Sequence, residues 1–267
     1  MRLLNRPRPD DPARVRSSPL RRALRVGLAG VALWLGATAH ADETSLTPVQ
    51  VGPNSYAVQF DSTAASNAGF VVTANAVVLV DAPETAAGSL QLLQEIRRIT
   101  PKPVSHVLLT RFDPARAGGL PVLKAAGAAI VARRPAQPMF AADVEADPAA
   151  LPDLPPADLA LEDSTDLLIG GVHIQAVSAG NAPGDEGMLY FFPDDGVLFT
   201  GDLAAPGRIP DIGTADTRRW IALLDELLAL DARVLVPRQG GNSTEPRTAL
   251  QASRDHLAAL CLQHECD

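Results

Sequence analysis

One polar loop holds the residues of this chain that are best suited to chemistry. The loop spans Thr110–Gly119 and carries Arg111, Asp113 and Arg116. It follows an apolar run, residues 104–109, that we expect to form a buried strand. Proteins of the α/β class place their chemistry in such loops, at the C-terminal ends of strands. Because guanidinium groups pair with carboxylates in a bidentate manner, these three side chains are suited to ion pairing or to anion binding.

The same loop resembles the signature of the metallo-β-lactamase-like hydrolases, Thr-His-x-His-x-Asp-His followed shortly by Gly-Gly. The chain keeps the frame of this signature and replaces its metal ligands. The retained frame residues are Thr110, Phe112, Pro114, Gly118 and Gly119. The four ligand positions hold, in order, Arg111, Asp113, Ala115 and Arg116. The resemblance implies zinc as the cofactor of the family, whereas this chain lacks the ligands to hold it.

Three later segments resemble the remaining motifs of the family, in chain order. They place Asn181 and Gln239 at two histidine positions and retain the bridging aspartate as Asp202. The segments are Gly-Asn-Ala-Pro-Gly-Asp at 180–185, Leu-Phe-Thr-Gly-Asp at 198–202 and Val-Pro-Arg-Gln-Gly at 236–240. The resemblance extends over residues 67–240, and residues 208–220 resemble the branch of quinoprotein relay system zinc metallohydrolases.

By this resemblance six of seven ligand positions have changed, so we expect no dinuclear zinc site and assign no catalytic residue. The candidate ligand-binding positions are Arg111, Asp113, Arg116, Asn181, Asp202 and Gln239. Three interpretations remain open. The arginines could form an internal ion-pair cluster with the two aspartates. The four oxygen-bearing side chains could hold calcium or magnesium, against repulsion from the arginines. Alternatively, the arginines could bind a carboxylate or phosphate ligand.

Two classes of function follow from this site. We favour a non-catalytic exported binding or accessory protein whose partner is a small anionic ligand or a periplasmic protein. The alternative is a hydrolase of the same fold with a rewired, metal-free or hard-metal site. No Ser-His or Cys-His arrangement is evident to support metal-free hydrolysis, because both cysteines lie at the C-terminus.

The elements around these motifs form two successive halves, each made of strands followed by helices. Helical spacing of apolar residues predicts amphipathic helices over 85–99, around 220–228 and over 246–263, with a shorter helix at 120–126. Residues 135–164 show no clear periodicity beyond a short helix near 138–145. Strands are expected at 56–60, 69–73, 76–80, 104–109, 129–132, 166–169, 173–177, 187–192, 196–200 and 234–236. This order predicts an α/β (α+β) fold, a four-layer αββα sandwich.

The first 41 residues have the composition of a secretory signal peptide. Arg21, Arg22 and Arg25 precede an apolar run at 26–37 and then the sequence Ala-His-Ala. This order of a basic region, an apolar region and an A-x-A site is the pattern of exported proteins, and the run is too short to span a membrane. We therefore expect a signal peptide at 1–41, a single domain at 42–267, and a periplasmic or secreted protein.

The charge of the remaining chain excludes two classes of partner. Residues 1–41 hold eight Arg and two Asp, so residues 42–267 carry 15 basic and 29 acidic residues, a net charge of −14. Such a chain repels nucleic acid and anionic lipid, so we expect neither nucleic acid nor, beyond the signal peptide, a membrane as partner.

Cys261 and Cys266 are out of disulfide reach within one continuous helix, so a bond requires the helix to end between them.

Overall fold

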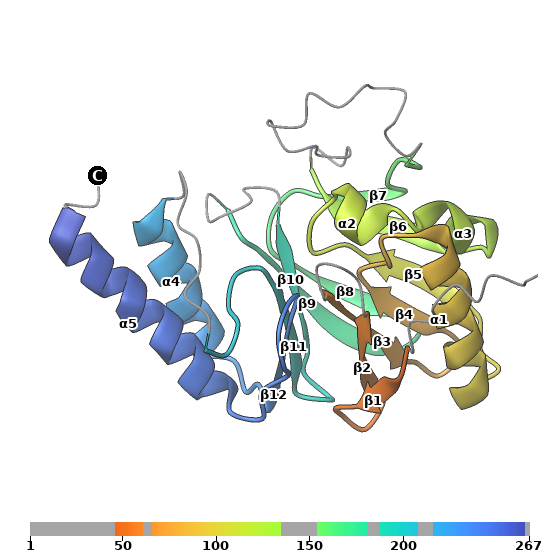
Figure 1. The fold of residues 1–267 in the computed structure, drawn as a ribbon, viewed down its shortest axis with the longest axis horizontal. Helices are drawn as coiled ribbons and strands as arrows, with labels where there is room; N and C mark the ends of the chain where they lie inside the picture. The colour runs from red at the N-terminus through yellow and green to blue at the C-terminus, as the bar shows by residue number, and fades with distance from the viewer. Residues whose placement is uncertain (1–45, 61–65, 135–153, 181–186, 208–215, 265–267) are drawn as a thin grey trace, which may run out of the picture. The chain divides into compact units, whose positions relative to one another are not determined.

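The computed structural model describes residues 46–60, 66–134, 154–180, 187–207 and 216–264, and all structural statements refer to these ranges. Residues 42–267 form one compact unit. Within it, two β-sheets carry helices on their outer faces (Figure 1). None of the helices in the described ranges has the length and apolar character that crossing a membrane requires.

The first sheet has seven strands that neighbour one another in chain order. Its first four strands pair antiparallel, and its last four pair parallel. The strands are β1 (Pro48–Gln50), β2 (Ser55–Phe60), β3 (Ser66–Val72), β4 (Val77–Val80), β5 (Val104–Leu108), β6 (Ala129–Arg133) and β7 (Leu159–Leu161). The helices α1 (Ala86–Ile99), α2 (Pro114–Ala117) and α3 (Leu120–Ala125) belong to this half.

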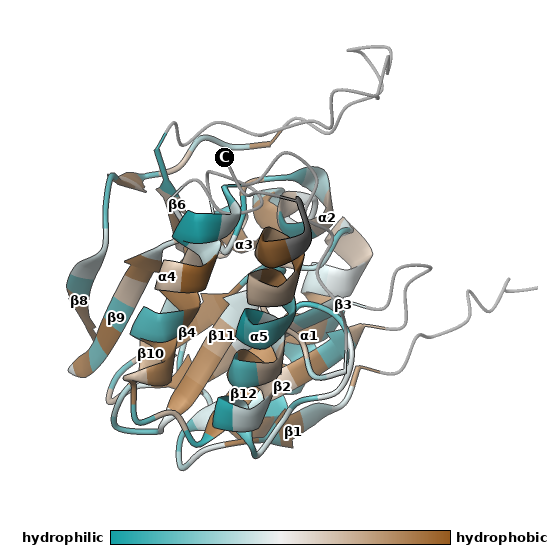
Figure 2. Cartoon of the chain, turned by 90° about the vertical axis from the view of Figure 1, so that its left-hand side faces the viewer, coloured by the Kyte–Doolittle hydropathy of each residue, from teal (hydrophilic) through white to brown (hydrophobic). Residues whose placement is uncertain are grey.

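The second sheet has five strands in the order β12, β11, β10, β9, β8. Only the β11–β12 pair is parallel. The strands are β8 (Thr165–Ile169), β9 (Val172–Ser178), β10 (Met188–Phe192), β11 (Val197–Gly201) and β12 (Val234–Pro237). The helices of this half are α4 (Thr217–Leu228) and α5 (Pro246–His264). Figure 2 shows α4 and α5 in front of largely hydrophobic strands, with hydrophilic residues on the turns of both helices.

Three separate hydrophobic cores hold the layers together. The first joins α1 and α3 to one face of the seven-stranded sheet, with Leu92 and Leu120 fully buried in it. The second lies between the sheets and contains Val78 and Tyr190. The third packs α4 and α5 on the five-stranded sheet around Trp220. Three cores between four layers confirm the predicted αββα sandwich.

The differences from the predicted elements are small and concern short segments. The strands β1 and β7 and the helix α2 were not predicted; they have three, three and four residues. Strand β3 begins at Ser66, three residues before its predicted start. The helix expected near 138–145 and the signal peptide lie outside the described residues. Cys261 is disulfide-bonded, and α5 ends at His264, before the other cysteine in the sequence.

Candidate functional site

The candidate site lies where the parallel strands of both sheets end. In the first sheet β4 leads to Asp81 and β5 leads to Thr110. In the second sheet β11 leads to Asp202 and β12 leads to Arg238. Backbone hydrogen bonds join the two halves here: the Met188 N–H donates to the Thr110 carbonyl at 2.8 Å. The topology thus brings four separate segments of the chain to one edge of the sandwich.

A buried carboxylate fixes the start of the Thr110 loop. The carboxylate of Asp81 accepts hydrogen bonds from the Thr110 N–H and the Thr110 hydroxyl, both at 2.7 Å. Asp81 adopts a left-handed backbone conformation, with φ of 61°, which aspartate tolerates better than most residues. Burial raises the pKa of Asp81 to about 6, although the charge of Arg116 and the hydrogen bonds from Thr110 act in the opposite direction.

Arg116 occupies the centre of the site and bridges two carboxylates. It lies on α2, whose N-cap Asp113 accepts a hydrogen bond from the Arg116 N–H. One terminal nitrogen of its guanidinium donates to Asp113 and the other donates to Asp202. Arg116 is 2% exposed. Burial alone would lower the pKa of Arg116, but the charges of Asp202, Asp113 and Asp81 together raise it above its usual value, so this guanidinium remains charged.

Two further arginines flank this bridge at longer distances. The Nε of Arg111 lies 3.5 Å from Asp113, and the Nη1 of Arg238 lies 3.7 Å from Asp202. The buried Nε atoms of Arg111, Arg116 and Arg238 have no hydrogen-bond partner among the described residues. Three guanidinium groups therefore lie beside the carboxylates of Asp113 and Asp202, and the charge of Asp81 also acts on Arg116.

Close packing explains why the chain keeps two glycines after α2. A Cβ atom on Gly118 would lie 1.9 Å from the Glu84 carbonyl oxygen, and one on Gly119 would lie 2.0 Å from the Ser89 hydroxyl. The Gly119 N–H also donates to the Pro83 carbonyl at 2.8 Å. The glycines therefore let α2 pack against the segment before α1, and this packing holds Arg116 in position.

Very little space remains inside the cluster. One cavity of about 10 Å³ is lined by Thr110, Arg111, Arg116 and Asp202, among others. A second, also of about 10 Å³, lies between Asp81, Thr110 and Arg238. Such volumes hold about one water molecule each. Among the described residues, the centre of the site is therefore filled by side chains and offers no room for a substrate.

The structure brings together most of the residues expected from the sequence. Asp113, Arg116 and Asp202 form the central bridge; Arg111 lies beside Asp113, and no contact places it on Asp202. Gln239 follows Arg238 after β12 and is partly buried. Asn181 lies outside the described residues.

Sequence reasoning missed two members of the site. Asp81 could have been found as the charged residue that ends the fully buried strand β4. Arg238 could have been found beside Gln239, at a glycine position of the resembled motif. Asp81 interacts with Arg116, and Arg238 lies beside Asp202; in each case the partner belongs to a distant segment of the chain. The residues next to Asp81 or Arg238 in the sequence do not indicate such a contact.

These side chains do not fit a zinc ion. A guanidinium already lies between the two aspartates, and its fixed charge repels a cation. Within the described ranges no group of three or more His, Cys, Asp or Glu is placed to hold a metal. The rings of His106 and His173 bond to Ser105 and Asp166 on their own sheets. The hard-cation interpretation, which needs Asp113 and Asp202 to face one ion, is likewise unsupported.

Comparison with known families identifies the fold. The profile of the family described as "Metallo-beta-lactamase superfamily" matches residues 62–239. The chain belongs to the metallo-β-lactamase superfamily. The match spans every segment that contributes to the arginine–aspartate site, from Asp81 to Gln239. The narrower resemblance of residues 208–220 to the quinoprotein relay branch stays a prediction.

Two known proteins are each 24% identical to the chain over the aligned residues. One is the "Linear primary-alkylsulfatase" of a Pseudomonas species, where the alignment covers 69% of this chain and 44% of the alkylsulfatase. The other is the "Metallo-beta-lactamase type 2" of Elizabethkingia meningoseptica, with 73% of this chain and 76% of that protein covered. The chain thus spans less than half of the alkylsulfatase and about three quarters of the lactamase.

Solved structures show the same metallo-β-lactamase architecture. The metallo-β-lactamase from Pontibacter korlensis superposes with a TM-score of 0.65 at 20% identity, covering 80% of this chain and 99% of that one. The metallo-β-lactamase from Erythrobacter litoralis gives 0.63 at 19% identity, covering 80% and 96%. At these identities the likeness shows the fold, and the chemistry of the site must be argued from its own residues.

The buried carboxylate of Asp81 predicts a pH dependence of stability. Because its folded pKa of about 6 lies above the ordinary 3.8, the folded protein holds this proton more tightly than the unfolded chain. Relative to Asp81→Asn, the wild type should be fully stabilised below pH 3.8, and this advantage should be lost as the pH rises through 6. The shift corresponds to roughly 3 kcal/mol.

Urea unfolding of both proteins between pH 4 and pH 7 checks this dependence. Asparagine retains an oxygen for the Thr110 N–H, so the variant should fold. The surface carboxylate of Asp158, whose pKa is lowered by Lys124, is present in both proteins, so its effect cancels in the difference between them. If the difference in unfolding free energy between wild type and variant stays constant from pH 4 to pH 7, Asp81 does not titrate in this range.

Proposed function

We propose that this chain is a non-catalytic member of the metallo-β-lactamase superfamily, in which the guanidinium of Arg116 replaces the metal as the positive centre of the site. The observation that carries the proposal is the bridge from Arg116 to both Asp113 and Asp202. A buried positive charge between two carboxylates compensates them as a cation would, without offering an open position for water.

The alternative, a hydrolase with a rewired site, would have to use the pair Thr110 and Asp81. The Thr110 hydroxyl donates to Asp81, and a carboxyl with a pKa of about 6 has the range of a general base. However, Asp81 and Thr110 are each 4% exposed, and the cavities beside Thr110 measure about 10 Å³. A substrate could not reach this hydroxyl through the described residues, so we do not favour the alternative.

A binding role for the cluster is supported by its two outer arginines. The side chain of Arg111 is 33% exposed, and its closest ion-pair distance is 3.5 Å. Arg238 is 3.7 Å from its carboxylate partner. The Nε of each of these guanidinium groups has no hydrogen-bond partner among the described residues, so each retains a donor for a carboxylate or phosphate group. We infer that the ligand of this accessory protein is a small anion held at the outer side of the cluster by Arg111, whose guanidinium is the most exposed of the three.

Two assays on the same purified protein test the proposed function. With zinc added, we expect no hydrolysis of a β-lactam or a thioester above the rate of the buffer. Titration with inorganic phosphate should give saturable binding that weakens at least about ten-fold in Arg111→Gln, which corresponds to 1.4 kcal/mol. Arg134→Gln, at an arginine 61% exposed and paired with Glu162, is the matched control. Zinc-dependent turnover that is lost in Asp202→Ala would contradict the proposal.

We further propose that the protein is exported and acts in the periplasm or outside the cell. The support is the tripartite pattern of residues 1–41 together with the disulfide at Cys261, since disulfides persist in oxidising compartments. N-terminal sequencing of protein from a periplasmic extract should give a start near Asp42. A cytosolic protein that retains Leu33–Leu35 would disprove export.

A further inference from the structure

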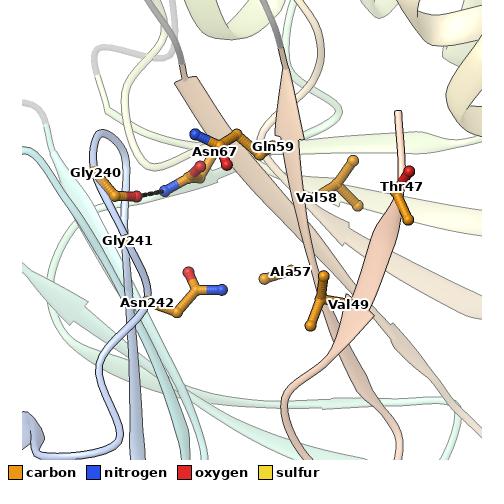
Figure 3. Close-up of a pocket in the computed structure, with 9 residues that line it drawn as sticks. All are labelled: Thr47, Val49, Ala57, Val58, Gln59, Asn67, Gly240, Gly241 and Asn242. Atoms are coloured by element: carbon orange, nitrogen blue, oxygen red, sulfur yellow. Dashed lines mark hydrogen bonds between the residues drawn. The ribbon is translucent and has the colours of Figure 1, made fainter. Parts of the chain in front are cut away.

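A second cavity lies beside the arginine cluster and is separate from it. It measures about 260 Å³ and opens between β1 and β2 on one side and the residues that follow β12 on the other (Figure 3). This is far more than the roughly 10–15 Å³ that a single water molecule requires. None of Arg111, Arg116, Arg238, Asp113 and Asp202 lines it.

The wall between this cavity and the cluster is held by Asn67. Its backbone N–H donates to the Arg238 carbonyl at 2.5 Å. Its side-chain amide donates to the Pro237 and Gly240 carbonyls, each at 2.8 Å, and Figure 3 shows the bond to Gly240. Gly240 has φ of +92°, a conformation that favours glycine. The wall is therefore fixed before any ligand arrives, which lowers the entropic cost of binding.

The lining of the cavity is polar but uncharged. Three side-chain amides, Gln59, Asn67 and Asn242, and the hydroxyl of Thr47 reach it. Because both amide hydrogens of Asn67 already bond to carbonyls, Asn67 can offer a ligand its Oδ1 as an acceptor. An ion bound here would lack a countercharge among the lining residues, and a purely apolar molecule would offer the Oδ1 of Asn67 no donor.

The floor of the cavity is apolar. Ala57 of β2 and its cross-strand partner Val49 of β1, which is 56% exposed, supply this apolar surface. A ligand that satisfies both surfaces must combine many hydrogen-bonding groups with a C–H face. Hydroxyl-rich rings have this combination.

We propose that this cavity is a binding site for an uncharged, hydroxyl-rich molecule of about the size of a monosaccharide. The proposal does not depend on the proposed function, since it uses none of the charged residues of the cluster. It assigns the amide groups to hydroxyl recognition, and Ala57 and Val49 to the C–H face of the ring.

Amide NMR spectra of the purified protein, recorded during titration with D-glucose, N-acetyl-D-glucosamine and D-glucuronate, test the proposal. At least one of the two neutral sugars should shift the signals of Asn67, Gly241 and Asn242, with a dissociation constant on the order of 1–10 mM. D-glucuronate, which adds a carboxylate to the glucose frame, should bind this cavity at least about ten-fold more weakly. If neither neutral sugar shifts these signals, or if glucuronate shifts them most, the proposal is wrong.

A variant whose side chain fills the cavity tests whether the sugar binds there. A Cβ on Gly241 meets no atom within 4 Å and its backbone is unstrained, so Gly241→Leu should fold and abolish the shifts. Ala252→Leu, on an exposed position of α5, is the control and should bind as the wild type does. Should Gly241→Leu fail to fold, Asn242→Ala should still weaken binding several-fold. Unchanged sugar binding in the folded filling variant would place the sugar elsewhere and overturn the proposal.

Discussion

Replacing Arg116 by alanine is expected to lower the free energy of unfolding by about 3 kcal/mol. Removing one partner of a buried ion pair costs about 3–5 kcal/mol, because the other charge stays behind uncompensated. Here two carboxylates lose their shared partner, and the guanidinium they lose is 2% exposed. The lower end of the range applies because the side chain of Asp202 is 39% exposed and water can solvate it.

Denaturant unfolding of three single variants measures this loss. Arg116→Ala should be far less stable than Arg111→Ala, because the Arg111 side chain is 33% exposed and 3.5 Å from its partner. Arg134→Ala, at an exposed pair with Glu162, should change stability by less than about 1 kcal/mol. Equal and small losses in all three variants would mean that the bridge contributes nothing to stability.

A zinc site is expected to appear when the bridge is replaced by histidines. The sequence alone suggests Arg111→His, Asp113→His and Asn181→His as the change that rebuilds three nitrogen ligands beside Asp202. The structure adds a fourth change, since the guanidinium of Arg116 would still repel the metal. With Arg116→His added, we expect about one zinc per chain, with an affinity about 10–100-fold below that of a native site because supporting hydrogen bonds are missing.

The triple variant, which retains Arg116, is the internal control for this experiment and should bind much less zinc. A second control carries histidines at Arg98, Arg134 and Arg247, three positions outside the cluster, and should bind no zinc that survives dialysis. If the folded quadruple variant gains no zinc over both controls, the positional match to the family's ligands is wrong.

The long elements of the fold could be predicted from the sequence. The apolar stripe around Trp220 marks α4, and α1 begins and ends within one residue of its predicted bounds. The short strands β1 and β7 could not be predicted, since three residues carry no periodicity and are held by pairing with β2 and β6. Similarly, α2 depends on the cap from Asp113, which a four-residue segment does not reveal by pattern.

Part of the candidate site was predicted from the sequence, whereas Asp81 and Arg238 were missed. The residues retained from the family motifs placed Asp113, Arg116 and Asp202 at ligand positions, and these three side chains form the bridge. The sequence could not tell which arginine reaches Asp202, because that depends on the direction of α2. Arg238 was missed because its contact with Asp202 joins the ends of β11 and β12, which lie 36 residues apart.

Elemental analysis of the purified wild-type protein after dialysis tests the central claim most directly. If the Arg116 guanidinium stands in place of the metal, the protein should contain no stoichiometric zinc, even when it is produced and purified with zinc present. The quadruple histidine variant, handled in parallel, shows that the procedure retains bound metal. A value near one zinc per wild-type chain would contradict the account.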